Sequence, residues 1–207
     1  GFRTSHEIQK VEVMDYEVFD RLLDRDALSR FRRRALNPNA PVTRGSAQND
    51  DVYFQAREAQ NKYYTDIPNV VEEYMSEISK VTGRHYAPFV YYGDKEATDI
   101  IVAMGSVNET VREVVDFLRE KEGRKIGLLT VHLYRPFSIE LMMKVLPKTV
   151  KRIAVIERTK EQGSIGEPLL LDVKSAFYGT DNAPHIIGGR YGLSSKDTTP
   201  GQIIAVY

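Results

Sequence analysis

The stretch IIVAMGSVNETVREVVDFL, Ile100 to Leu118, shows the fold most clearly, because an extended apolar run passes directly into a helical pattern. Ile100 to Met104 is continuously apolar, as expected of a strand buried on both faces of a sheet. Ser106 and Glu109 match a capping box. Apolar side chains then recur at helical spacing: Val107, Val111, Val114, Val115 and Leu118. The stretch therefore predicts a β-strand followed by an amphipathic α-helix.

The same alternation of strand and helix continues towards the C-terminus. Further strands are predicted at residues 126–131, 153–156 and 185–187. Helices are predicted at residues 138–143, at 169–177 and after Thr199, where Pro200 and Gln202 complete a capping signal. Short connections between alternating strands and helices argue for a parallel sheet with helices on both faces. We therefore predict an α/β fold with a doubly wound, mainly parallel sheet in a Rossmann-like three-layer arrangement.

The N-terminal third reads differently, as helical and irregular. Helices are predicted at residues 16–23, 24–36 and 67–82, and an aromatic extended stretch at residues 86–92. The apolar pattern before residue 65 is too irregular to indicate a segment that folds alone. We therefore divide the chain into a helical or irregular segment, 1–65, and an α/β domain, 66–207.

Composition excludes several classes of function. The 207 residues carry no formal net charge, so nothing favours a nucleic-acid or anionic-membrane surface. No apolar run has the length of a membrane span and the first residues do not resemble a signal peptide, so we expect a soluble, cytoplasmic chain. Cysteine is absent, which excludes cysteine-ligated clusters on this chain. Because the chain has no initiator Met and stops within a helical pattern at Tyr207, we expect a piece of a longer polypeptide.

The loop ERTKEQGSIGEP, residues 157–168, is the strongest candidate site, since ligands of doubly wound sheets bind at the carboxyl ends of strands. Gly163, Ser164 and Gly166 are weak candidates for binding coenzyme A or another phosphate, because the glycines let backbone amides converge before a helix N-terminus. However, the G-x-x-G spacing matches neither a dinucleotide fingerprint nor a P-loop, and the neighbouring glutamates would repel an anion. The pattern favours the alternative, a tight βα connection with Pro168 at the first helical position.

Other polar segments give weaker signals. Loops at residues 105–109 and 132–138 also follow strands, and Arg135 in the second is a candidate carboxylate ligand or part of a packing loop. The arginines of residues 30–34 indicate a solvated helix face. Structural roles are expected for the four histidines, His6, His85, His132 and His185. The roles of RTSHE, which contains His6, and of RGSAQN stay open. No complete catalytic constellation is present.

Six segments together resemble the pyruvate:ferredoxin (or flavodoxin) oxidoreductase family. They are GFRTSHEIQK, TRGSAQNDDVYFQAREA, IIVAMGSVNETVREVVDFL, LYRPFS, IERTKEQGSIGEPLLLDVK and GGRYGLSSKDTTPGQIIAV. The resemblance extends from Gly1 to Tyr207 and rests on the order and number of the segments rather than on a catalytic signature. It implies that residues 1–65 end a pyrimidine-binding domain. It also implies that residues 66–207 form a second domain, similar to the C-terminal domain of transketolase.

The resemblance carries expectations about the parent enzyme. The family oxidises pyruvate with coenzyme A to acetyl-CoA and carbon dioxide, and it passes electrons to ferredoxin or flavodoxin. This implies thiamine diphosphate, Mg²⁺ and iron–sulfur clusters as cofactors, with a homodimer and other domains of the same polypeptide as partners. The chain lacks a GDG…N pattern for magnesium diphosphate, so we expect no catalytic or metal residue here and interpret it as a scaffold. Two alternatives stay open: a coenzyme A- or phosphate-binding module at Gly163–Gly166, or the same domain of another 2-oxoacid oxidoreductase.

Overall fold

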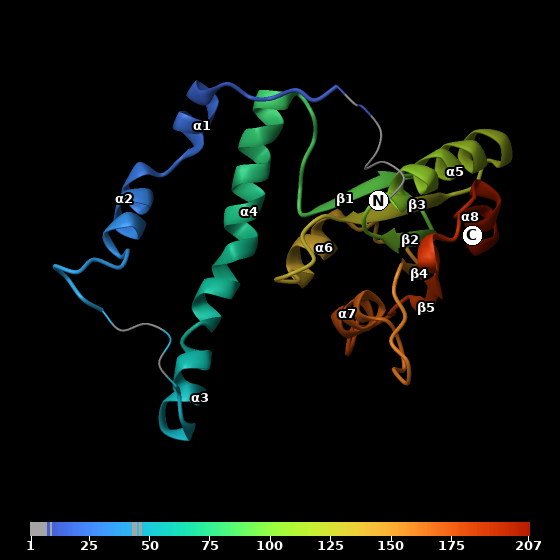
Figure 1. Ribbon diagram of the computed structural model, residues 1–207. Coiled ribbons are helices and arrows are strands. Elements are labelled where there is room, and N and C mark those ends of the chain that lie inside the picture. Colours follow the sequence, from blue (N-terminus) through green and yellow to red (C-terminus); the bar gives the residue numbers. More distant parts are fainter. Residues whose placement is uncertain (1–7, 9, 43–44, 46) are drawn as a thin grey trace.

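The computed structural model describes residues 8, 10–42, 45 and 47–207, and shows an elongated helical arm beside an α/β body (Figure 1). His6, all of RTSHE and part of RGSAQN lie outside the described residues. The arm consists of α1 (Tyr16–Leu22), α2 (Arg25–Arg33), α3 (Asp50–Glu58) and α4 (Asn61–Thr82). Of these helices, α3 was not predicted, and α4 begins six residues before the predicted start at residue 67.

The body is built on one five-stranded sheet with the strand order β1-β3-β2-β4-β5. Its strands are β1 (Phe89–Gly93), β2 (Asp99–Ala103), β3 (Ile126–Val131), β4 (Arg152–Glu157) and β5 (His185–Arg190). Strands β3, β2, β4 and β5 run parallel to one another, whereas β1 is antiparallel to β3. This confirms the predicted α/β fold with a mainly parallel sheet. The antiparallel first strand was not predicted.

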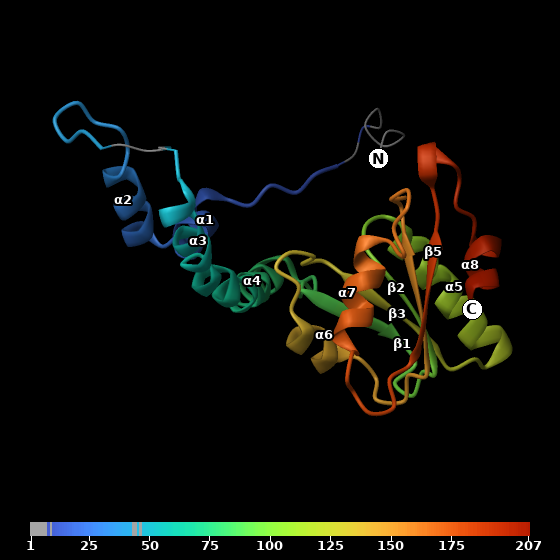
Figure 2. The ribbon, with the colours of Figure 1, turned by 90° about the horizontal axis from the view of Figure 1, so that it is seen from below.

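Helices cover both faces of the sheet, as predicted (Figure 2). On one face, α6 (Ile139–Val145) and α7 (Pro168–Ala176) pack against a core that includes Val102, Leu129 and Leu169. On the other face, α5 (Val107–Glu122) and α8 (Pro200–Val206) pack against a second core that includes Ile101 and Leu128. Neighbouring residues of each central strand therefore enter opposite cores, which explains why the strands read as continuous apolar runs.

The chain reverses its direction of winding between β2 and β4. The helix after β2, α5, lies on one face, and the helix after β4, α7, lies on the other. In open α/β sheets, such a switch point opens a crevice at the carboxyl ends of the two strands. The loops that follow β2 and β4 are therefore the places where a ligand site is expected.

The backbone shows how several helices begin and end. Gly83 and Gly123 end α4 and α5 in the left-handed region, with φ of 69° and 64°. Thr199 and Gln202 form the predicted capping box of α8, and the Ser138 side chain accepts a hydrogen bond from the Leu141 amide. Apart from α4, predicted bounds shift by up to three residues; for example, α2 already ends at residue 33 and β5 continues to residue 190.

The capping box predicted at Ser106 and Glu109 is wrong. The backbone of Ser106 is already helical, with φ −67° and ψ −19°, and its side chain makes no capping hydrogen bond. A side-chain N-cap requires an extended backbone at that residue. Instead, Nδ2 of Asn108 donates to the Gly105 carbonyl at 2.8 Å and stabilises the turn that enters α5.

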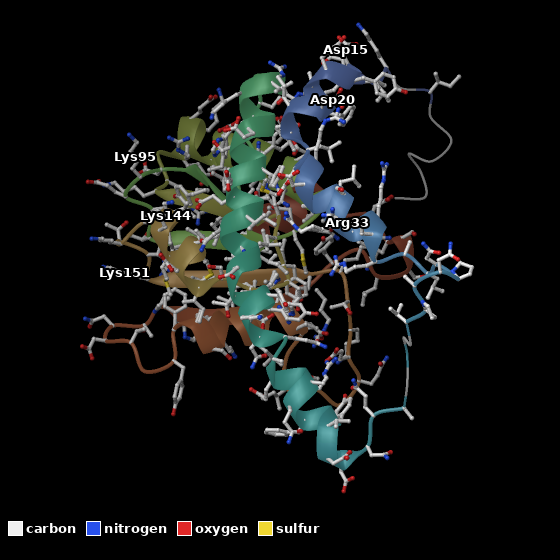
Figure 3. The ribbon with its side chains drawn as sticks, turned by 90° about the vertical axis from the view of Figure 1, so that its left-hand side faces the viewer. Asp15, Asp20, Arg33, Lys95, Lys144 and Lys151 are labelled. Carbon is white, nitrogen blue, oxygen red and sulfur yellow. The ribbon has the colours of Figure 1, made fainter. Side chains whose placement is uncertain are left out.

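The arm has little core of its own. Pro68 is the one buried residue described in its four helices, while Phe31, Tyr53, Phe54 and Tyr63 are all more than half exposed. Two polar contacts fasten α4 to the body. Lys144 of α6, labelled in Figure 3, pairs with Glu72 at 3.1 Å, and the Tyr86 amide donates to Ser79 Oγ at 2.9 Å. Within the described ranges, no helix combines the length and apolar character needed to cross a bilayer.

Candidate functional site

The candidate loop between β4 and α7 is organised around a buried carboxylate, Glu157. Its side chain is only 3% exposed. Its Oε1 accepts a hydrogen bond from the Leu169 amide at 2.8 Å, and its Oε2 accepts one from the Leu170 amide at 2.9 Å. The first amides of a helix have no partner within the helix and bind anions. Glu157 therefore occupies the position at the start of α7 that an external phosphate would need.

The ionisation of Glu157 reflects two opposing effects. Burial raises its pKa, because the charged form loses its hydration. The amides of Leu169 and Leu170 oppose this effect by donating to the charged form, but the pKa still lies above its ordinary value. The nearby carboxylates of Glu167 and Asp172 raise the pKa further.

A second carboxylate, Glu167, closes the loop from its other end. Its Oε2 accepts a hydrogen bond from the Glu161 amide at 2.9 Å, and its Oε1 accepts one from Nε of Arg190 at 2.5 Å. Burial raises the pKa of Glu167, but the Arg190 guanidinium and the Glu161 amide outweigh burial and hold it below its usual value. The loop is thereby attached to the end of β5.

The three predicted ligand residues bond mainly within the loop itself. Ser164 Oγ donates to the Gly166 carbonyl at 2.6 Å and accepts from the Gly166 amide at 3.3 Å. Gly163 has φ of 80°, a turn conformation that suits glycine. Gly166 is buried, and an added Cβ would lie 3.0 Å from Leu170 Cδ2. This geometry supports the βα-connection interpretation, although ligand binding by these residues stays a prediction.

The two cations of the loop are also engaged within the chain. Arg158 Nε donates to the Gly192 carbonyl at 2.8 Å, and Lys160 Nζ donates to the Glu161 carbonyl at 3.3 Å. From the sequence, the glutamates of the loop are expected only to repel an anion, whereas in the structure the carboxyl group of Glu157 itself takes the anion position at the start of α7. The available signal was a carboxylate at the end of a buried strand, just before a loop that leads into a helix N-terminus.

Arg135 in the loop after β3 binds a carboxylate of its own chain. Its guanidinium pairs with Asp172 of α7 at 2.8 Å and stacks on the Tyr134 ring, 3.9 Å from the ring centroid. Phe137 packs edge-on against Phe89, with ring centroids 5.5 Å apart. Burial and the Asp172 carboxylate raise the pKa of the Tyr134 hydroxyl. These contacts support the packing interpretation of this loop.

The third predicted loop, at the end of β2, lies at the switch point. The Tyr191 hydroxyl donates to the Met104 carbonyl at 3.4 Å, so this side chain links the end of β5 to the end of β2. Burial raises the pKa of Tyr191. His132 Nδ1 lies 2.8 Å from the Ala87 carbonyl, which is a structural contact. In the part of the chain that the structure describes, no cluster of three or more His, Asp and Glu could hold a metal ion.

We expect Glu167→Gln to change the acid dependence of stability. The folded-state pKa of Glu167 is lowered, so its contribution is fully present above the unfolded pKa and is lost as pH falls through the folded value. The variant should therefore be less stable than the parent chain at pH 7, and the difference should shrink below about pH 4. Urea unfolding over a pH series measures it. A difference that stays constant with pH would contradict the assignment.

The chain is similar to known proteins of one enzyme family. Residues 97–203 match the family model "Pyruvate:ferredoxin oxidoreductase core domain II", and residues 1–76 match "Pyruvate flavodoxin/ferredoxin oxidoreductase, thiamine diP-bdg". The whole chain is 59% identical to a pyruvate-flavodoxin oxidoreductase of Enterobacter agglomerans and 51% identical to a pyruvate:ferredoxin oxidoreductase of Moorella thermoacetica. The chain spans 18% of the length of each of these relatives.

Among solved structures, one match is a 2-oxoglutarate:ferredoxin oxidoreductase from Magnetococcus marinus. It is 22% identical, with a TM-score of 0.42, and the alignment covers 63% of this chain and 20% of that one.

Proposed function

The chain belongs to the pyruvate:ferredoxin oxidoreductase family, and from this premise we propose that it is a non-catalytic scaffold within a thiamine-diphosphate-dependent enzyme. The proposed enzyme oxidises pyruvate with coenzyme A to acetyl-CoA and carbon dioxide, and it reduces ferredoxin or flavodoxin. One observation carries the proposal. Two domains of this family, one matched by residues 1–76 and the other by residues 97–203, follow each other in the chain, and the chain spans 18% of its relatives' length.

The scaffold role is supported by how the polar groups are used. The loops at the carboxyl ends of β3 and β4 direct their charged side chains towards their own backbone and towards neighbouring carboxylates. A binding loop instead keeps donors free for its ligand. The groups that a catalytic role would need are therefore already engaged within the chain.

We further propose a division of the chain at about residue 65. Residues 1–65 would be the end of the pyrimidine-binding domain, and the exposed apolar side chains of the arm would pack against the rest of that domain. Residues 66–207 would be the second domain, similar to the C-terminal domain of transketolase. The helix α4 crosses this boundary without interruption.

We propose that the residues present here do not hold the cofactors of the parent enzyme. The sequence has no cysteine for an iron–sulfur cluster. The described residues contain no cluster of metal-binding side chains for Mg²⁺. Glu157 already fills the anion position of α7. We propose that thiamine diphosphate, Mg²⁺, the iron–sulfur clusters and coenzyme A bind other parts of a cytoplasmic, homodimeric parent enzyme.

The test uses the full-length polypeptide that carries this sequence, purified without oxygen. We expect reduction of flavodoxin or ferredoxin that requires both pyruvate and coenzyme A. The relatives' names give both carriers, so each should be assayed. Reduction with 2-oxoglutarate but not with pyruvate would favour the alternative, the same domain of another 2-oxoacid oxidoreductase.

A charge placed in the loop distinguishes the scaffold hypothesis from the hypothesis of a coenzyme A-binding module. Ile165 lies between Ser164 and Gly166 and is 94% exposed, so Ile165→Glu should not disturb the fold. We expect the KM for coenzyme A in the full-length enzyme to stay within about twofold of the parent value. A carboxylate close to a bound phosphate would instead weaken binding by roughly tenfold. Ile165→Gln is the uncharged control, and a rise in KM with Glu alone would contradict the scaffold interpretation.

A further inference from the structure

Two loops at the same end of the sheet are tied to each other by two arginines (Figure 2). They are the β4 loop, residues 158–167, and the β5 loop, residues 191–199. Arg158 directly follows β4, and its side chain bonds to the β5 loop. Arg190 is the last residue of β5, and its side chain bonds to the β4 loop. Each of the two strands is therefore followed or ended by a side chain that holds the loop of the other.

The side chain of Arg158 lies across the β5 loop. Its Nε donates to the Gly192 carbonyl at 2.8 Å, and its Nη2 donates to Ser195 Oγ at 3.4 Å. An added Cβ at Gly192 would lie 3.3 Å from Arg158 Cδ, so a side chain at this position would crowd the arginine. The hydroxyl of Tyr191 donates to the Met104 carbonyl at 3.4 Å. The β5 loop is thereby attached to the ends of both β4 and β2.

The β5 loop contains a strained turn, formed by Ser194 and Ser195. Their φ angles are 49° and 61°, a left-handed conformation that is unfavourable for residues other than glycine. Residues 193–196 are exposed, so burial gives the turn little support. Such conformations persist only where the surrounding structure fixes them. The side-chain contact described for the strained turn comes from Arg158.

The β5 loop forms one wall of a hollow of about 320 Å³. Ile156 of β4 and Ile203 of α8 line the hollow together with Leu193 of the loop. The two isoleucines are only 3% and 2% exposed, whereas Leu193 is 40% exposed. Burial of apolar side chains therefore favours the closed position of the loop. The strained turn opposes that position, so the Arg158 contacts decide how often the loop opens.

The second arginine connects this opening to the β4 loop. Arg190 Nε donates to Glu167 Oε1 at 2.5 Å, and Glu167 Oε2 accepts a hydrogen bond from the Glu161 amide at 2.9 Å. Arg190 lies two residues before Gly192, whose carbonyl is held by Arg158 at the start of the β4 loop. A displacement of either loop therefore strains a contact that holds the other.

We propose that the β5 loop is a lid, held closed by Arg158, and that it opens together with the β4 loop as one cooperative unit. The strained turn favours opening, and loss of the Arg158 contacts releases it. Opening exposes the apolar side chains that line the hollow. Every contact involved lies within this chain, so the lid does not depend on the proposed reaction of the parent enzyme.

Hydrogen exchange in the full-length polypeptide, resolved to single residues, tests the cooperative opening. The Lys196 amide, which donates to the Leu193 carbonyl at 3.1 Å, reports on the β5 loop, and the Glu161 amide reports on the β4 loop. Arg158→Gln removes a charged donor and should speed exchange of the Lys196 amide on the order of tenfold. The Glu161 amide should accelerate by a similar factor, because the two loops open together. Acceleration confined to the β5 loop would overturn the proposal.

Arg190→Gln is the reciprocal experiment. It removes the charged donor from Glu167 and should speed exchange of the Glu161 amide, again on the order of tenfold. If the loops form one unit, the Lys196 amide in the other loop accelerates as well. Acceleration of the Glu161 amide alone would show that the two loops open independently and would overturn the proposal.

Lys160→Gln is the matched control for Arg158→Gln. It removes the same charge from the same loop, but Lys160 Nζ donates only to the neighbouring Glu161 carbonyl, at 3.3 Å. Neither reporter amide should change its exchange rate by more than about twofold in this variant. Equal acceleration in Lys160→Gln and Arg158→Gln would assign the effect to charge rather than to the lid contacts, and would overturn the proposal.

The contribution of the strained turn is tested by Ser194→Asn, because asparagine adopts a left-handed backbone more readily than serine. In the Arg158→Gln background, this change should slow exchange of the Lys196 amide by roughly threefold. Exchange that stays the same or becomes faster would contradict a lid that opens by release of strain.

Side-chain labelling by hydroxyl radicals then measures access to the hollow. Ile156 and Ile203 should be labelled severalfold more in Arg158→Gln than in the parent polypeptide or in Lys160→Gln. Leu193 is already exposed in the closed loop and serves as the internal reference. Equal labelling of the two isoleucines in all three proteins would overturn the proposal.

Discussion

Replacing Glu157 by alanine is expected to lower the free energy of unfolding by roughly 2–5 kcal/mol. The variant leaves the amides of Leu169 and Leu170 without an acceptor at a site from which water is largely excluded, and it opens a void where the side chain was. The loss should concentrate at the contact between β4 and α7. Urea unfolding of the chain, followed by circular dichroism, measures it.

Two further variants separate the hydrogen bonds from the charge. Glu161→Ala removes an exposed carboxylate from the same loop and should change stability by no more than about 0.5 kcal/mol. Glu157→Gln keeps one oxygen acceptor and should give an intermediate loss. Since the folded pKa of Glu157 is raised, its stabilising contribution is present at low pH and is lost as pH rises through that pKa. The cost of Glu157→Gln should therefore grow as pH falls, and a cost that shrinks would contradict this account.

Gly93→Ala is expected to cost about 3 kcal/mol or more, although it adds a single methyl group. Gly93 has φ of 133°, and an added Cβ would lie 2.6 Å from both Gly127 Cα and the Ile126 carbonyl oxygen. Both atoms belong to the backbone of β3, so no side chain can turn aside to relieve the clash. The end of β1 must separate from β3, which urea unfolding and hydrogen exchange along these strands would both detect.

The control for Gly93 is Gly105→Ala. Gly105 also has positive φ, 82°, but an added Cβ would meet no atom within 4 Å. The control should therefore cost only the backbone strain, about 1–2 kcal/mol. Equal losses in the two variants would show that strain, rather than the contact between β1 and β3, decides the effect.

The central strands and their helices could be predicted from the sequence because the side chains on both faces of these strands are buried against helices. Ile100 to Ala103 and Ile126 to Val131 bury nearly every side chain, so their apolar runs stand out. The direction of β1 could not be predicted, because the alternation of side chains is the same in parallel and antiparallel strands. The prediction of a capping box at Ser106 was wrong because the backbone of Ser106, after the turn at Gly105, is already helical.

The position of the candidate loop between a strand and a helix could be predicted, but its internal hydrogen bonds could not. The sequence shows glycines before a helix with Glu157 nearby, and it does not show which oxygen the helix amides meet. That depends on the packing of β4 against α7, which brings Glu157 within hydrogen-bond distance of amides 12 and 13 residues further along the chain. The bounds of β5 were underestimated because its two glycines and its exposed edge weaken the apolar pattern.

The continuous helix α4 has a mechanical consequence. It starts within the residues matched to the thiamine-diphosphate domain and ends six residues beyond them, at Thr82. A helix of this length is a rod of roughly 33 Å that resists bending far more than a loop does. A rotation of the domain at the start of α4 would therefore displace the α/β body at the other end of the helix. We expect bending between the two at Pro68, which removes one backbone hydrogen bond inside the helix, and after Gly83, where the helix ends in a left-handed turn.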